Sequence, residues 1–173
     1  IRDFLEEKQL LLLLNSYIIS MFTYAPVIWM FCSKTLSKEI ERIHKRALRA
    51  VSCDFYSSYE TLLISSGCKR IHEIHIYHIL CEVYKTLHNL NPSFMQALFR
   101  AKPLRYSFRN GNLLLLPVAK SQRFGTQSFL FRGGFLWNAL PDSAKSQITL
   151  ETFKRSLKAL NLLKLCTCKI CKI

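Results

Sequence analysis

The chain has 173 residues, 50% of them hydrophobic, and its mean hydropathy of +0.11 excludes a disordered linker. This length suits one domain or two small ones with modest cores. Its 25 lysines and arginines against 11 aspartates and glutamates give a formal net charge of +14. Such a charge favours a polyanionic partner, and nucleic acid and an anionic membrane surface are the two candidates. The alternative is that the protein is basic but has no polyanionic partner.

The first elements expected along the chain are helices. Residues 3–24 have a helical pattern, and a short helix over 25–32 follows it, with Pro26 in its first turn. Ser37 can cap a third helix that runs to about Val51, whose apolar residues three and four apart form one buried stripe. The cations of this helix fall mostly off the stripe: Lys38, Arg42, Lys45, Arg46 and Arg49. The pattern predicts a basic amphipathic helix.

No charged residue occurs from Gln9 to Ser33, a segment long enough to cross a bilayer. The same segment contains polar side chains such as Asn15 and a proline in its middle, which suit a buried helix pair at least as well as a span. We expect the buried pair and no membrane partner. A membrane-associated basic protein anchored by residues 9–33 remains an alternative.

Helices continue through the middle of the chain. Ser57 and Glu60 have the spacing of a capping box for a short helix, which Gly67 ends. A long helix is expected over 71–90 and a short one over 93–99.

The character of the chain changes at Arg100. Prolines and glycines interrupt residues 100–126, which we interpret as loops with one or two short strands. Residues 127–140 are ambiguous because a Gly-Gly pair breaks them, and Thr149 can cap a last helix. The sequence therefore predicts a mainly α fold.

No acidic residue occurs between Glu82 and Asp142, whereas an ordinary solvated surface mixes both signs of charge. Cations that follow a phosphate backbone, together with aromatic rings for bases, make a surface for single-stranded nucleic acid. A core with basic loops explains the aromatic residues equally well. The cations of this interval are Lys85, Arg100, Lys102, Arg105, Arg109, Lys120, Arg123 and Arg132.

Seven cysteines, an odd number without a visible signal peptide, indicate reduced thiols or metal ligands in an intracellular, nuclear or cytoplasmic compartment. The tail offers three thiols: Cys166, Cys168 and Cys171. Structural zinc takes four ligands, so a zinc site here needs a fourth from elsewhere in the chain or from a second chain. His72, His75 and His78 recur every third residue, a spacing that drifts around a helix and does not suit one metal ion.

Several segments follow one another in a specific order along the chain. The first, from Tyr24 to Trp29, has the form Tyr-x-Pro-x-x-Trp, and the second, from Ile40 to Arg49, has the form Ile-x-x-Ile-x-Lys-Arg-Ala-Leu-Arg. Further segments are 58–63, 82–85, 90–92, 123–126, 135–141, 153–154 and the cysteine tail. Together they resemble the thumb and post-polymerase region of non-LTR, LINE-type (jockey-like) retrotransposon reverse transcriptases.

The resemblance implies three parts: a thumb-like helical bundle over 1–53, a helical connector over 54–99 and a basic C-terminal region with a Cys-rich tail over 100–173. It also implies that the chain, which begins with Ile1, is a fragment of a longer polyprotein. The palm and fingers of that polyprotein, with RNA and DNA, are then its partners. A host-derived, Cys-rich interaction module that depends on zinc remains a further alternative.

Two-metal nucleotide transfer needs clustered carboxylates, and the only aspartates here are the unpaired Asp3, Asp54 and Asp142. The paired aspartates of the family's RNA-directed DNA polymerase are missing, so the chain should be inactive alone.

The expected role of the chain is to hold template–primer or target DNA by the phosphate backbone during target-primed reverse transcription. The expected contacts are Lys38, Arg42, Lys45, Arg46, Arg49, Arg105, Arg109, Lys120, Arg123 and Arg132. For the basic helix the alternative is a solvated face, with Glu39 and Glu41 as local partners.

Overall fold

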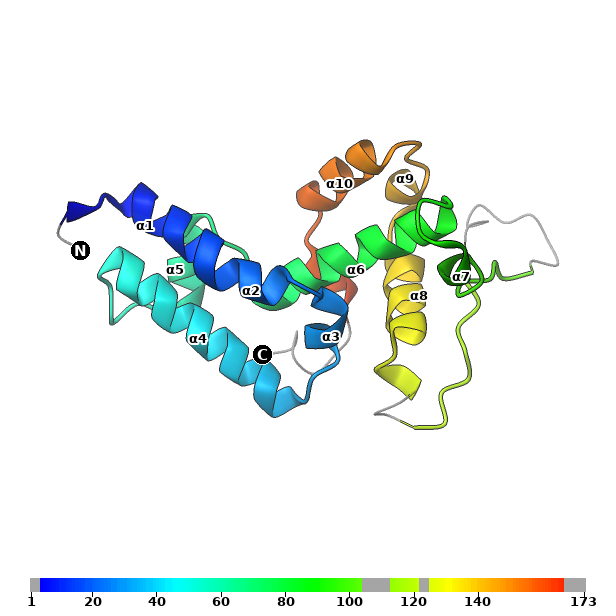
Figure 1. Ribbon diagram of the computed structural model, residues 1–173, viewed down its shortest axis with the longest axis horizontal. Coiled ribbons are helices and arrows are strands. Elements are labelled where there is room, and N and C mark those ends of the chain that lie inside the picture. The colour runs from blue at the N-terminus through cyan, green and yellow to red at the C-terminus, as the bar shows by residue number, and fades with distance from the viewer. Residues whose placement is uncertain (1–3, 104–112, 122–124, 167–173) are drawn as a thin grey trace. The chain divides into compact units, whose positions relative to one another are not determined.

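The structure, a computed structural model, describes residues 4–103, 113–121 and 125–166 (Figure 1). Most of these residues are helical, which confirms the mainly α fold. Extended pairing among them is limited to an isolated antiparallel bridge between Ala101 and Leu114. Two backbone hydrogen bonds flank this bridge, from Lys102 N to Leu113 O and from Leu115 N to Arg100 O, each 2.8 Å. One or two short strands are expected over 100–126. In the described part of that segment the backbone pairing stops after these two hydrogen bonds, so it forms an isolated bridge and not a strand.

The chain divides into two compact units, residues 1–75 and 76–173, which we call unit 1 and unit 2. The boundary falls inside one helix, α6 (Ile71–Leu87). The two units are defined by how densely the residues of each contact one another. The three parts over 1–53, 54–99 and 100–173 rest on sequence character and on the resemblance, and they stay predictions.

Unit 1 begins with one helical run from Glu7 to Thr23. Its segments are α1 (Glu7–Leu13), the π-helical turn η2 (Leu14–Ile19) and α2 (Ser20–Thr23). Ala25 then adopts a left-handed backbone with φ of 50°, and Pro26 starts α3 (Pro26–Met30) at the position where a missing N–H costs nothing. In the part of the chain that the structure describes, no helix is both long enough and apolar enough to cross a membrane.

The basic helix α4 (Lys34–Ser52) starts one turn earlier than predicted. Its cap is Ser33, whose hydroxyl accepts a hydrogen bond from Leu36 N, so the prediction that Ser37 caps this helix is wrong. The next helix, α5 (Tyr59–Ser66), is capped by Ser58 rather than Ser57. Gly67 ends α5 with φ of 65°, as predicted, because glycine adopts this left-handed conformation without steric cost.

The core of unit 1 is aliphatic. The helical run from α1 to α2 lies along α4 (Figure 1), and α5 also packs against α4. The buried residues of this core are Leu14, Ile19, Ile40, Leu48, Leu62, Leu63 and Ile71. The uncharged segment from Gln9 to Ser33 thus supplies part of a globular core, as expected.

Unit 2 contains the rest of α6 and a series of shorter helices. These are α7 (Ser93–Gln96), α8 (Phe129–Ala139), α9 (Asp142–Lys145), α10 (Leu150–Ala159) and the 3-10 turn η4 (Leu162–Leu165). Thr149 caps α10 as predicted, with its hydroxyl accepting from Thr152 N. The ambiguous segment 127–140 becomes α8.

The glycine pair lies inside α8 and does not break it. A Cβ on Gly133 would come within 2.8 Å of Val83 Cγ2, and one on Gly134 within 2.8 Å of Leu116 Cδ2. The pair therefore allows neighbouring side chains to approach the helix backbone more closely than any larger residue would.

The core of unit 2 is rich in aromatic rings. Tyr84 stacks on Phe153 with ring centroids 4.4 Å apart, and Trp137 contacts the same phenylalanine at 5.9 Å. All three side chains are buried, and the Tyr84 hydroxyl donates to the backbone oxygen of Gln147 at 2.9 Å. Rings in these geometries contribute beyond the area that they bury.

Candidate nucleic-acid interface

Six cations lie on the side of α4 opposite its buried residues. At 3.6 residues per turn they fall within an arc of about 120°, whereas Ile40, His44 and Leu48 face the core. We call this set the basic face of α4: Lys34, Lys38, Arg42, Lys45, Arg46 and Arg49. The structure thus brings together all five cations predicted for this helix. It adds Lys34, which was missed because the helix was expected to start at Ser37.

Most of the basic face is open to solvent. Lys45 and Arg49 are half-buried, and the other four cations are exposed. Arg42 pairs with Glu39 at 2.6 Å, but both side chains are exposed, and a surface pair of this kind contributes little. No ion pair among the described residues engages Lys38 or Arg46. The face therefore presents a largely uncompensated row of positive charge.

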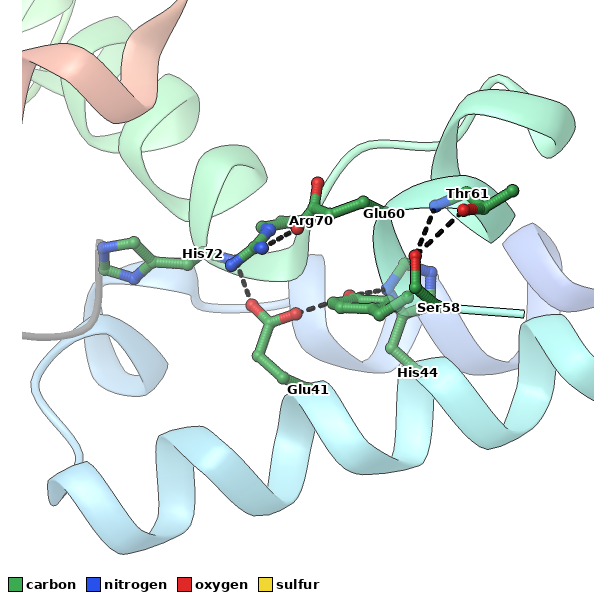
Figure 2. A network of polar contacts seen from close by, with 8 residues as sticks. Glu41, His44, Ser58, Glu60, Thr61, Arg70 and His72 are labelled. Atoms are coloured by element: carbon green, nitrogen blue, oxygen red, sulfur yellow. Dashed lines mark hydrogen bonds and ion pairs between the residues drawn. The ribbon is translucent and has the colours of Figure 1, made fainter. Parts of the chain in front are cut away.

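Glu41 borders the basic face but turns inward (Figure 2). Its carboxylate accepts hydrogen bonds from the Tyr59 hydroxyl and from His72 N, the latter at 3.1 Å and at the start of α6. The Tyr59 oxygen in turn lies 2.8 Å from His44 Nδ1. Since the hydroxyl proton is given to Glu41, the imidazole is the donor in that second bond.

Burial sets the protonation of this network. It raises the pKa of Tyr59 far above its usual value, with the charge of Glu41 adding to the effect, so the phenol remains a donor. Burial also lowers the pKa of His44, against the opposing effect of Glu41, which favours a neutral ring at pH 7. The negative charge of Glu41 is thus used within unit 1. Of the two local partners proposed for a solvated face, only Glu39 pairs with a cation of α4.

The acid-free interval after Glu82 does not form an equivalent array in the residues described. Lys120 is exposed, and Arg132 is half-buried with Nη1 3.4 Å from the sulfur of Cys166. Lys85 pairs with Glu82 at 2.7 Å. The remaining predicted contacts of this interval, namely Arg105, Arg109 and Arg123, lie outside the described residues. Their part in binding stays a prediction.

The cysteine tail is described only up to Cys166, which is buried. Cys168 and Cys171 lie outside the described residues, and within those residues no group of three or more potential ligands gathers around one point. The zinc site stays a prediction. The histidine row has a structural use, since His75 Nε2 lies 2.9 Å from the backbone oxygen of Phe22.

The two described aspartates have local roles. Asp54 accepts hydrogen bonds from the backbone N–H groups of Tyr56 and Ser57, and the bonds with Ser57 chiefly hold its pKa below the usual value. Asp142 starts α9, with Oδ1 3.8 Å from the Nζ of Lys145. Asp3 lies outside the described residues. Neither described aspartate belongs to a carboxylate pair.

No protein-family model matches this chain, and no curated protein or solved structure matches it significantly. The function of the chain is therefore inferred from its own residues, above all from the basic face of α4.

Proposed function

We propose that this chain holds nucleic acid by its phosphate backbone, and that the basic face of α4 is the principal contact. The observation that carries the proposal is a row of cations on one side of a helix whose other side is buried. From Lys34 to Arg49 the row spans about 22 Å at 1.5 Å per residue. Binding of this kind draws its free energy from the release of counterions that phosphates condense around themselves.

The face suits holding rather than reading a sequence. Phosphate contacts orient a protein on a duplex, whereas specificity needs polar groups placed against base edges. Long, exposed side chains such as Lys38 and Arg46 meet the first requirement, because they reach phosphates without a fixed geometry. The described side chains of this face supply no fixed array for base edges.

The segments that resemble LINE-type reverse transcriptases give this role a setting. In that setting the chain is the thumb and post-polymerase region of an RNA-directed DNA polymerase, and it holds the template–primer or the target DNA. The palm and fingers of the same polyprotein supply the catalytic aspartates. We therefore expect no polymerase activity from the chain alone, and nucleotide incorporation by it on a primed RNA template would contradict this setting.

The decisive test is charge reversal on the basic face. The triple variant Lys38→Glu, Arg42→Glu and Arg46→Glu should lower the affinity for an RNA–DNA hybrid duplex by roughly 100-fold or more at low salt. The slope of log K against log salt should fall by about 3, since each lost phosphate contact removes about one unit. Fluorescence anisotropy over a salt series measures both quantities.

A matched control separates this face from the total charge. Arg155→Glu, Lys158→Glu and Lys164→Glu lower the net charge by the same amount at exposed positions on α10 and η4. This control should change the affinity only a few-fold, through long-range charge alone. Equal losses in the two triple variants would refute α4 as the site, and no affinity in the unchanged chain would refute the proposed function.

A further inference from the structure

The loop between α4 and α5, residues 53–58, displays two neighbouring aromatic rings to solvent. Phe55 is 59% exposed and Tyr56 is 99% exposed. Complete exposure of a tyrosine is unusual, because its ring normally buries against neighbouring apolar surface. The two rings belong to unit 1 and follow directly after the helix that carries the basic face.

The backbone of this loop is held in place. Cys53 ends α4 with a left-handed φ of 58°. The carboxylate of Asp54 accepts from Tyr56 N at 3.0 Å and from Ser57 N at 2.9 Å, and Ser58 caps α5. The rings are therefore presented from an ordered turn, so a ligand that stacks on them need not order this backbone.

Positive charge adjoins the loop that carries the rings. Arg49 Nη2 donates to the backbone oxygen of Ser57 at 3.4 Å, and its Nε is buried without a partner among the described residues. Arg46 lies one turn earlier on the same face of α4. The loop that carries the rings thus follows the C-terminal end of the basic face and contacts it through Arg49.

The acidic side chains nearest in sequence already have partners. Asp54 is bound within the loop, and Glu60 forms an ion pair with Arg70. The end of α4 carries the partial negative charge of its last carbonyls, which opposes a phosphate but not an uncharged base. This favours a base over the loop and a phosphate farther back, beside Arg46.

We propose that Phe55 and Tyr56 form a stacking platform for the unpaired bases of a nucleic acid whose backbone lies on the basic face of α4. Aromatic faces stack on any base, while cations follow the backbone, and this combination is typical of single-strand binding. The proposal rests on the proposed function and makes it more specific, because it places a single-stranded end beyond the duplex. The polar neighbours Asp54, Ser57 and Ser58 make a contact with an apolar protein surface less favourable.

The test compares overhangs that carry equal charge. The full chain is titrated against a hybrid duplex that is blunt, that ends in a few unpaired adenines, or that ends in the same number of abasic sites. Because the two overhangs carry the same phosphates, their difference in affinity reports the bases alone. The unchanged chain should prefer the adenine overhang over the abasic one by roughly ten-fold.

Removing the rings should remove this preference. The variant Phe55→Ala and Tyr56→Ala should bind the two overhangs equally and keep its affinity for the blunt duplex within about two-fold. Tyr56→Phe should retain the preference, because a phenyl ring stacks as well as a phenol. As a matched control, Tyr24→Ala removes another exposed tyrosine, 82% accessible, at a distance in the sequence, and it should change nothing.

The remaining outcomes would overturn the stacking platform. Blunt-duplex binding without a preference for adenines, or a preference that survives loss of both rings, overturns the stacking platform and leaves the proposed function intact. Equal losses on all three duplexes assign the rings a structural role and overturn it as well. If the two rings instead support self-association, measured by sedimentation, without any effect on nucleic acid, the platform is a protein contact and the inference is wrong.

Discussion

The two compact units are stabilised by different chemistry. Unit 1 combines an aliphatic core with a partly buried polar network, in which Glu41, Tyr59 and His44 are linked by hydrogen bonds. Unit 2 has an aromatic core centred on Phe153, which contacts Tyr84 and Trp137. Both units carry excess positive charge, but among the described residues the longer row of cations on one helix, the basic face of α4, belongs to the first.

A half-buried acid with partners inside its own unit can leave a neighbouring surface basic. In unit 1 the network draws Glu41 towards the interior, so the adjacent cations of α4 lose a neutralising neighbour. In unit 2 individual cations are themselves drawn inward. Lys145 is buried, its Nζ lies 3.3 Å from the backbone oxygen of Asn138, and burial lowers its pKa although Asp142 opposes this. Whether a charged side chain faces solvent or the interior therefore depends on which partners the fold places near it.

The largest effect should come from the aromatic core. Phe153→Ala should destabilise unit 2 by roughly 3–5 kcal/mol, because it removes a fully buried ring and leaves a cavity. Each unit contains one tryptophan, so unfolding followed by the fluorescence of Trp137 in a Trp29→Phe background reports unit 2. A loss below about 1 kcal/mol would show that this ring does not organise the core.

The polar network of unit 1 should come next. Glu41→Ala should cost roughly 2–3 kcal/mol, because the Tyr59 hydroxyl and His72 N lose a charged acceptor. Trp29 fluorescence in a Trp137→Phe background measures the stability of unit 1. Glu39→Ala is the matched control, since this glutamate is exposed and should change stability by less than about 0.5 kcal/mol. Equal effects of the two changes would contradict the network.

A smaller effect is expected at the glycine pair. Gly133→Ala should destabilise unit 2 by about 1 kcal/mol, because overpacking against Val83 exceeds the gain in helix propensity. Val83→Ala should reduce this cost when the two changes are combined, which a double-mutant cycle under chemical denaturation measures. If Gly133→Ala stabilises the unit instead, the close approach at this glycine is wrong.

The stability of unit 1 should depend on pH through His44. Burial lowers the pKa of this histidine from its ordinary value of 6.5, so below about that pH the unfolded chain takes up a proton that the folded chain does not. Stability should therefore be constant above this range and fall as the pH decreases through it. His44→Gln should flatten this part of the profile, and an unchanged slope would exclude His44 as its source.

The smallest effect concerns the edge of the basic face. Glu39→Gln should raise the affinity for a hybrid duplex by about two- to three-fold, because it releases Arg42 from its ion pair. The salt slope should rise by less than one unit. Arg132→Gln in unit 2 should leave both quantities nearly unchanged, because Arg132 is directed to Cys166. A larger effect of Arg132→Gln would place an important contact in unit 2.

Local signals predicted several helix boundaries and missed others. Gly67 and Thr149 act as predicted, because a left-handed glycine and a threonine cap need only their own neighbours in the chain. Ser33 and Ser37 are both competent caps one turn apart, and the earlier one is used because the longer helix gains further backbone hydrogen bonds. The Gly-Gly pair indicated a break, whereas contacts with Val83 and Leu116 make it part of α8.

The sequence by itself determined the helical fold class, the excess of positive charge and the basic side of α4, because composition and a 3.6-residue period are local properties. Only the tertiary structure decided how the acids near that side are used. Glu41 bonds to groups 18 and 31 residues away, and no pattern within one helix specifies such partners. The exposure of Phe55 and Tyr56 was likewise decided by folding, since burial depends on what else packs against a loop.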